Sequence, residues 1–332
     1  MSGRNLNLLC IDGGGIRGLS ALYILQKLME LIQPDDPPKP CDCFDLIGGT
    51  STGGWIAIML GRLRMSADEC ITAFMDLQDE IFTKSSTGSK NNASNVDSPM
   101  YDMSTLEKGF KKIIASRGLD AESLLKDTDK PSCKVFVTAT TAVGPSTEIL
   151  SSYFRPRGPS ELYKHTKIWE AARATSATGS FFGPIEIGPQ KRKFYDGSAL
   201  TTNPVEKIWE EAAEMVEDTD LLRDKVNCLV SIGTGLRSLT SFDDSAEGLL
   251  QTLMSIATDA ETTADRFQRD KSELFQNKSC YRFSAPSVGN IDLNTPEVKG
   301  DVAQMTDHYI RKEDTWNLLR QCKSKLSPRV GM

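Results

Sequence analysis

Residues 6–18 read LNLLCIDGGGIRG, and this stretch decides the fold. The short and mostly apolar run Leu6–Ile11 predicts a buried strand. Three consecutive glycines follow Asp12, and apolar residues then recur at helical spacing from Leu19 to Ile32. A strand, a glycine turn and a helix in this order are typical of α/β folds. The glycine amides at the start of the helix can turn outward toward an anion.

A second strand, glycine turn and helix follow at residues 44–60. Phe44–Ile47 predicts the strand, residues 49–53 read GTSTG, and the helix is expected from about Gly53 to Leu60. GxSxG is the nucleophile-elbow pattern, in which small neighbours permit the sharp turn that exposes a serine hydroxyl. The pattern alone is weak, so its place between a strand and a helix carries the interpretation. We identify Ser51 as the candidate nucleophile, and the alternative is a tight turn without chemistry.

The rest of the chain continues to alternate strands and helices. Further strands are predicted at Lys134–Thr141, Glu148–Phe154, Cys228–Ile232 and Tyr281–Ser284. Further helices are predicted at Ile168–Thr175, Pro204–Val216, about Ser245–Phe267 and about Asp301–Lys325. The polar segment 84–99 predicts a mobile loop, either a plain surface insertion or a lid over a site. The alternation predicts a largely parallel sheet with helices on both faces.

The length of the chain permits two domains, but its sequence favours one. At about 150 residues per domain, 332 residues would make two. No linker rich in proline or glycine divides them, so we expect one domain over residues 1–332. Its clear motifs lie in residues 6–205, a helical continuation runs to about residue 325, and residues 326–332 form a tail.

The composition excludes several classes of function. The chain has 39 Lys and Arg against 45 Asp and Glu, a net charge of −6, which argues against a nucleic-acid surface and a broad polybasic membrane patch. No run approaches about 18 apolar residues, so we expect no transmembrane helix, and the first residues lead us to expect no cleavable signal peptide. Eight scattered cysteines and two histidines do not fit a zinc site. We expect reduced, mostly buried cysteines in a cytoplasmic protein without a metal or cofactor.

The candidate nucleophile needs a base, and histidine is scarce. His165 lies in a charged stretch before a helix and His308 lies in the last helix, so we interpret both as solvated surface residues. Asp196 begins the turn Asp196-Gly197-Ser198. A carboxylate is a weak base in water, but burial raises its pKa and lets it accept the proton of Ser51. From spacing alone, an aspartate that only caps the turn is an equal alternative.

Together these segments resemble the motif set of the patatin-like phospholipase family. The matching segments, in the family's order and spacing, are Asp12–Gly18, Gly49–Gly53 with Gly54, Trp169–Ala177 and Asp196–Gly197. The clear resemblance covers roughly residues 6–205, and Val230–Gly235 extends it. It implies a three-layer α/β/α fold with a mainly parallel central sheet, related to the cytosolic phospholipase A2 catalytic domain.

The resemblance also implies the site residues and the reaction. Ser51 would be the nucleophile and Asp196 the base, and members of the family cleave acyl esters of phospholipids, lysophospholipids or neutral glycerolipids without calcium in the catalytic step. The oxyanion hole would be formed by the backbone amides of Gly14, Gly15, Ile16 and Arg17. The remaining motif glycines are Gly13, Gly18, Gly49, Gly53 and Gly197. The family usually has Gly or Ala where this chain has Ser198, whose hydroxyl can bond Asp196 and lower its basicity.

Several partner expectations follow from the resemblance. The chain is most similar to intracellular members that head larger multidomain proteins, including fungal ones, so further domains of a longer polypeptide are expected. A membrane phospholipid substrate implies peripheral membrane contact, for which Lys191-Arg192-Lys193 and Phe181-Phe182 are candidates. The alternatives are a solvated loop and core packing. Arg17 would either contact a lipid phosphate or brace the glycine loop.

Two other classes of function are alternatives. A catalytically silent or activation-dependent module that binds lipid or a partner is disfavoured by the intact Ser51 and Asp196. A nucleotide-binding α/β protein is suggested by the GxGxxG spacing of residues 13–18. That pattern requires an acidic residue at a second strand end, whereas Asp35 and Asp36 lie in a proline-rich break. An esterase of membrane lipids is therefore the favoured function.

Overall fold

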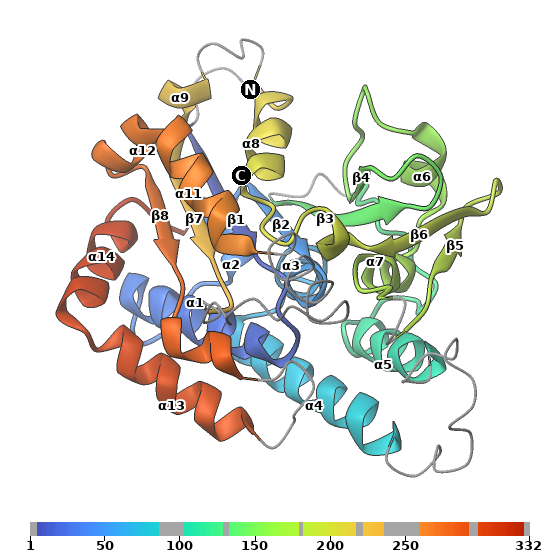
Figure 1. Cartoon of the computed structure of the whole chain (residues 1–332), viewed down its shortest axis with the longest axis horizontal. Helices are drawn as coiled ribbons and strands as arrows, with labels where there is room; N and C mark the ends of the chain where they lie inside the picture. Colours follow the sequence, from blue (N-terminus) through green and yellow to red (C-terminus); the bar gives the residue numbers. More distant parts are fainter. Residues whose placement is uncertain are drawn as a thin grey trace, which may run out of the picture.

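The computed structural model describes residues 5–85, 103–128, 133–178, 182–216, 222–235, 259–291 and 298–328. These residues form an eight-stranded sheet between two layers of helices (Figure 1). The predicted three-layer α/β/α fold is confirmed.

The strands and helices have the following bounds. The strands are β1 Leu6–Ile11, β2 Leu46–Thr50, β3 Lys134–Thr141, β4 Thr147–Ser151, β5 Ile185–Ile187, β6 Arg192–Asp196, β7 Val226–Ile232 and β8 Cys280–Phe283. The helices are α1 Gly18–Ile32, α2 Pro40–Cys43, α3 Thr52–Ala57, α4 Ala67–Ser85, α5 Met103–Ser116, α6 Ser160–His165, α7 Ile168–Thr175, α8 Val205–Ala213, α9 Leu222–Lys225, α11 Ala260–Asp270, α12 Ser272–Gln276, α13 Lys299–Ile310 and α14 Glu313–Lys323. Short 3₁₀ turns cover Gly15–Arg17, Gly197–Ala199 and Pro286–Asn290, and a π-helical turn covers Ile58–Arg62.

The sheet has a parallel centre and an antiparallel side. Its order is β5-β6-β3-β2-β1-β7-β8, and β4 also pairs with β3. The pairs from β3 through β2, β1 and β7 to β8 are parallel, whereas β4, β6 and β5 are added antiparallel. The predicted mainly parallel sheet therefore holds for the five strands of the centre.

The two edges of β3 are used differently, and this matters for the site. β4 pairs with residues 136–140 of β3, and β2 pairs with residues 134–138 on the opposite edge. β6 pairs with residues 139–141, so it must share the edge of β2. The register continues from Thr50 opposite Thr138 to Asp196 opposite Ala139. Along this edge of β3, the residues paired with β6 therefore start directly after the last residue paired with β2.

Alternate residues of the central strands face two separate cores. In β1, Leu9 and Ile11 pack with α1, α3, α7, α13 and α14, whereas Leu8 and Cys10 pack with α8, α11 and α12. Both sets are fully buried, which explains why β1 is mostly apolar without alternating between apolar and polar residues. All eight cysteines are buried, as predicted.

The bounds of β2 correct the sequence interpretation. We predicted a strand at Phe44–Ile47 followed by a glycine turn, but the strand is Leu46–Thr50 and includes Gly48 and Gly49. Glycine is normally a turn signal, but here strands on both sides supply the hydrogen bonds. The ring of Phe136 fills the space beside Gly48.

The predicted helix at Asp301–Lys325 is two helices. α13 ends at Ile310, and α14 begins at Glu313 after an extended Lys312. Glu313 and Asp314 lie in the first turn of α14, where negative charge stabilises a helix start. The apolar residues of both helices pack against the core, as their spacing predicted.

Two predictions lie wholly or partly outside the described residues. The loop expected at 84–99 begins inside α4, which continues to Ser85, and the rest of it is not described. The helix expected at about Ser245–Phe267 is described only from residue 259, where α11 covers Ala260–Asp270. Among the helices that are described, none is long and apolar enough to cross a membrane.

The close contact between β2 and β3 generates a stability prediction. A Cβ atom at Gly48 would lie 2.2 Å from Cζ of Phe136, whose ring is fully buried. We expect Gly48→Ala to lower the free energy of unfolding by about 1–3 kcal/mol in urea denaturation. Gly300→Ala is the matched control, because no atom lies within 4 Å of its Cβ position and alanine favours the helix by about 1 kcal/mol. Equal stability of the two variants would contradict the prediction.

Candidate active site

Ser51 occupies a strained turn between β2 and α3. Its backbone has φ 53° and ψ −127°, a left-handed conformation that is rare for a residue with a side chain. The carbonyl of Ser51 accepts from the amides of Gly54 and Trp55, and its own amide donates to Oγ1 of Thr175 over 2.8 Å. The hydroxyl does not cap the helix. It is directed out of the turn and is half-buried, as a nucleophile elbow requires.

Asp196 lies directly in front of this hydroxyl. Oγ of Ser51 donates to Oδ2 of Asp196 over 3.1 Å, although the residues are 145 positions apart in the chain. The backbone of Asp196 is fixed by its amide, which donates to the carbonyl of Ala177, and by Thr140, whose hydroxyl donates to its carbonyl. The shared edge of β3 thus brings together the two residues that the sequence singled out.

The carboxylate of Asp196 is desolvated but well bonded. It is 7% exposed, and burial raises its pKa above the ordinary value. Three hydrogen bonds oppose this by stabilising the charged form. Thr178 Oγ1 donates to Oδ2 over 2.6 Å, the Ser198 amide donates to Oδ1 over 2.7 Å, and Ser51 donates as above. The hydroxyl of Ser198 acts in the same direction, as expected for this departure from the family pattern.

The first glycine turn packs against the Ser51–Asp196 pair. A Cβ atom on Gly13 would lie 2.6 Å from Oγ of Ser198 and 3.2 Å from Cβ of Ser51, so only glycine permits this approach. The loop is held by the Gly13 amide, which donates to the Thr202 carbonyl, and by Thr234 Oγ1, which donates to the Gly13 carbonyl. No acceptor in the described part of the chain bonds the amides of Gly14 or Gly15. They are free to meet a negative oxygen.

The side chain of Arg17 braces the glycine loop through hydrogen bonds to backbone carbonyls. Its side chain is buried, with Nη1 donating to the Gly289 carbonyl over 2.9 Å and Nε donating to the Gly14 carbonyl over 3.3 Å. This geometry corresponds to the bracing alternative. The amide of Arg17 donates to the Gly14 carbonyl, so it is not available as an oxyanion donor. The candidate donors are therefore reduced to Gly14, Gly15 and Ile16.

The other candidates from the sequence lie outside this site. His165 and His308 are exposed, and His165 contacts Glu161 on its own helix. Phe182 is buried in the core, whereas Phe181 lies outside the described residues.

The basic run at the β5–β6 hairpin is only partly available for a ligand. Arg192 pairs with Glu148 over 2.8 Å, and Lys191 and Lys193 are exposed. These two lysines remain candidates for contact with anionic headgroups.

The sequence did not identify the threonines that complete the site. Thr175 and Thr178 lie in and just after α7, and Thr202 and Thr234 hold the glycine loop. The segment Trp169–Ala177 was recognised as part of the family pattern without a function for its threonine. Its function is to fix the amide of Ser51, which only the tertiary contact reveals.

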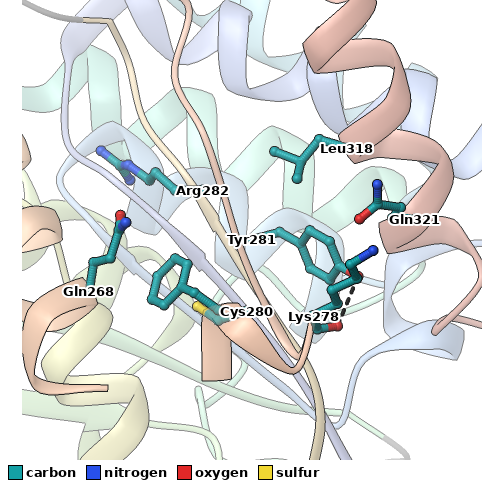
Figure 2. Close-up of a pocket in the computed structure, with 8 residues that line it drawn as sticks. Gln268, Lys278, Cys280, Tyr281, Arg282, Leu318 and Gln321 are labelled. Carbon is teal, nitrogen blue, oxygen red and sulfur yellow. Dashed lines mark hydrogen bonds between the residues drawn. The ribbon is translucent and has the colours of Figure 1, made fainter. Parts of the chain in front are cut away.

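A cavity of about 270 Å³ lies elsewhere, between β8, α11, α12 and α14 (Figure 2). Its wall includes Gln268, Lys278, Arg282 and Leu318, but neither Ser51 nor Asp196. Within the described ranges, no three His, Cys, Asp or Glu side chains are grouped to hold a metal ion. The candidate site presents the serine hydroxyl of Ser51, the carboxylate of Asp196 and the backbone amides of Gly14 and Gly15.

Comparison with known proteins finds a matching family model and several similar proteins. Residues 9–209 match the family model of the patatin-like phospholipases. The chain is 30% identical over 324 residues to mouse calcium-independent phospholipase A2-gamma, which covers 95% of this chain and 39% of the mouse protein. It is 24% identical to Plasmodium falciparum patatin-like phospholipase 1, with 95% of this chain and 49% of that protein covered. This chain therefore spans less than half the length of these curated relatives.

A solved structure gives a weaker likeness. VipD from Legionella pneumophila aligns with 97% of this chain and 68% of its own, with a TM-score of 0.42 and 13% sequence identity.

The hydrogen bonds to Asp196 generate a pH prediction. Thr178 stabilises the charged carboxylate, so Thr178→Val should raise the pKa of Asp196 further. A base must be deprotonated to act, and the acid limb of Ser51 reactivity should therefore move to higher pH. The measurement is the rate of fluorophosphonate labelling of Ser51 against pH.

Two further variants are compared with Thr178→Val for their shift of the acid limb. Ser198→Ala removes a weaker donor and should shift the limb in the same direction by less. Thr72→Val removes a hydroxyl from the exposed face of α4 and should leave the limb in place. A limb that stays fixed or moves to lower pH in Thr178→Val would exclude Asp196 as the base.

Proposed function

Because this chain belongs to the patatin-like phospholipase family, we propose that it is a calcium-independent lipid acyl hydrolase. In this proposal, Ser51 and Asp196 cleave acyl esters of membrane phospholipids or lysophospholipids through an acyl-serine intermediate. The observation that carries it is the 3.1 Å hydrogen bond from the strained Ser51 to the buried Asp196, beside the free amides of Gly14 and Gly15. The names of the relatives supply the substrate class.

Acylation begins when Ser51 attacks the ester carbonyl. Its Oγ forms a bond to the carbonyl carbon while its proton passes to Oδ2 of Asp196, the oxygen that it already bonds. The carbonyl oxygen becomes negative and is stabilised by the amides of Gly14 and Gly15, each worth about 3 kcal/mol. The tetrahedral intermediate then collapses. Its bond to the glycerol oxygen breaks, and Asp196 gives its proton to that oxygen.

Deacylation repeats the same steps with water. Asp196 takes a proton from a water molecule, which attacks the acyl-serine carbonyl. The oxyanion again faces the glycine amides, the bond to Oγ breaks, and Ser51 regains a proton from Asp196 as the fatty acid leaves. A single carboxylate can therefore serve as the base in both halves, and no histidine is needed.

The environment of Asp196 is what makes its carboxylate suitable as a base. Burial raises the pKa of the carboxyl group, which makes it a stronger base than an aspartate in water. The hydrogen bonds from Thr178 and the Ser198 amide orient both oxygens and keep the charged form accessible.

We also propose how the protein meets a bilayer. Val143 is 92% exposed in the β3–β4 turn, which bonds the β6 backbone through Ala142 and Lys193. Leu200 is 49% exposed four residues after Asp196, and its neighbour Thr201 bonds Thr147 beside the same turn. Apolar side chains that enter a headgroup layer and cations that bind anionic lipids would together face the membrane. The protein would then be cytoplasmic and peripheral to membranes.

The hairpin of β5 and β6 supplies those cations. It projects from the edge of the sheet (Figure 1) and carries the exposed Lys191 and Lys193. Both are close in sequence to Asp196, so a membrane held here would lie near the proposed site.

Fatty-acid release tests the proposed reaction. We expect wild-type protein to release fatty acid from mixed-phospholipid liposomes with a chelator present. Ser51→Ala and Asp196→Asn should lower the rate by about 10⁴-fold or more. The exposed Ser116→Ala and Asp265→Asn are matched controls and should retain the wild-type rate.

Each result separates one hypothesis. Substantial activity in Asp196→Asn would contradict the dyad. A wild-type protein that releases no fatty acid and is not labelled by a fluorophosphonate would contradict the hydrolase and favour the lipid-binding or partner-binding alternative.

The docking proposal has its own test. Val143→Asp and Lys191→Glu should weaken sedimentation with vesicles that contain anionic phospholipid, each placed in the Ser51→Ala protein so that the vesicles are not consumed. The same substitutions in active protein should leave hydrolysis of a soluble short-chain ester unchanged. Lys312→Glu is a matched control on an exposed site between α13 and α14. Unchanged vesicle binding in both test variants would assign docking to another surface.

A further inference from the structure

A buried ion pair lies directly before the glycine loop. Asp12 follows the last residue of β1 and is fully buried. Its Oδ2 accepts from Nη2 of Arg282 over 2.6 Å. Arg282 belongs to β8, and β7 lies between β8 and β1. The arginine therefore extends across a whole strand to reach a residue one position before Gly13.

Arg282 is held from three elements. Its Nη1 donates to Oγ of Ser231 on β7 over 2.8 Å, and its Nη2 also donates to Glu261 on α11 over 2.6 Å. The register places Cys10, Ser231 and Arg282 side by side across β1, β7 and β8. Figure 2 shows Arg282 and Tyr281 leaving β8 in opposite directions. Arg282 is thus fixed on the α8–α11 face of the sheet.

Two polar atoms of this ion pair lack a hydrogen-bond partner, which is not expected of a purely structural ion pair. Among the described residues, Oδ1 of Asp12 and Nε of Arg282 are buried without a hydrogen-bond partner. Buried polar atoms normally find partners, and a buried ion pair contributes little net stability. Burial raises the pKa of Asp12 to about 6, and Arg282 opposes this by favouring its charged form. Arg282 therefore keeps the carboxylate of Asp12 in its charged form and balances its negative charge next to the glycine loop.

Other hydrogen bonds also hold the loop. Gly13 bonds Thr202 and Thr234, and Arg17 bonds backbone carbonyls. The pair of Asp12 and Arg282 differs from these hydrogen bonds because both of its groups are charged, and it acts on the residue that begins the turn.

We propose that Arg282 is a positioning residue for the oxyanion hole. Through Asp12 it fixes the direction in which the Gly14 and Gly15 amides point. It also cancels the negative charge of Asp12, which would otherwise oppose a second negative charge on the oxyanion nearby. This inference rests on the proposed function, and it assigns Arg282 no contact with substrate.

The test uses kinetics and labelling together. Arg282→Gln should lower kcat for a soluble ester by about 10²-fold, because small misplacements of donors cost that much, and leave KM within about twofold. Fluorophosphonate labelling of Ser51 should slow by a similar factor, since it also builds negative charge on an oxygen in the hole. Arg266→Gln is the matched control, because Arg266 lies on α11 like Glu261 and forms an exposed ion pair with Glu206 of α8.

A double variant separates positioning from folding. Asp12→Asn combined with Arg282→Gln leaves two neutral groups that can bond each other, so it should recover part of the lost kcat relative to Arg282→Gln alone. The melting temperature of each variant is measured beside its kinetics, and rates are compared well below it. If Arg282→Gln does not fold, Arg282→Lys decides by the same kcat, KM and labelling values.

The outcomes are distinct. A folded Arg282 variant with wild-type kcat and labelling rate, and only a lowered melting temperature, would overturn the inference and leave a structural ion pair. Lower kcat and slower labelling at unchanged KM, with recovery in the double variant, would support it. A wild-type protein that neither hydrolyses ester nor is labelled contradicts the proposed function itself.

Discussion

The unequal lengths of β2 and β3 are the constraint on which the site depends. β2 stops at Thr50 so that the chain can turn at Ser51, and β3 continues for three residues beyond the partner of Thr50. Unpaired backbone groups in a buried strand are costly, so another strand must satisfy that edge. β6 does so, and its last residue is Asp196. The need to complete one edge of a sheet thus sets a carboxylate against a serine.

The electrostatics of the site follow from this placement. The carboxylate at the end of β6 is buried away from water, which raises its pKa and makes it useful as a base. Full burial without partners would keep it protonated, so Thr178 and the Ser198 amide offset part of that cost. Burial of a carboxylate is also costly next to the glycine loop, where the ion pair with Arg282 offsets the cost of burying Asp12. In both places hydrogen-bond donors stabilise a buried carboxylate, from nearby residues at Asp196 and from a residue 270 positions away at Asp12.

The sequence predicted the bounds of some strands and helices correctly and those of others wrongly. Leu6–Ile11 and Lys134–Thr141 were predicted with the bounds that the strands have, because both consist mostly of apolar or β-branched residues. Gly48 and Gly49 were taken for a turn, because glycine lowers strand propensity and only neighbouring strands reverse that. The break between α13 and α14 was missed, because the apolar spacing continues through it and no proline or glycine marks it.

The sequence by itself determined the order of strands and helices, the serine at an elbow, the glycine turn before a helix and an aspartate at a turn. These are local patterns, since backbone conformation and helical or strand spacing depend on near neighbours. Only the tertiary structure decided that Asp196 meets Ser51, that Thr175 and Thr178 fix the two residues, and that Arg282 reaches Asp12. These contacts join residues up to 270 positions apart. Strand order and register create them, and no local pattern records either.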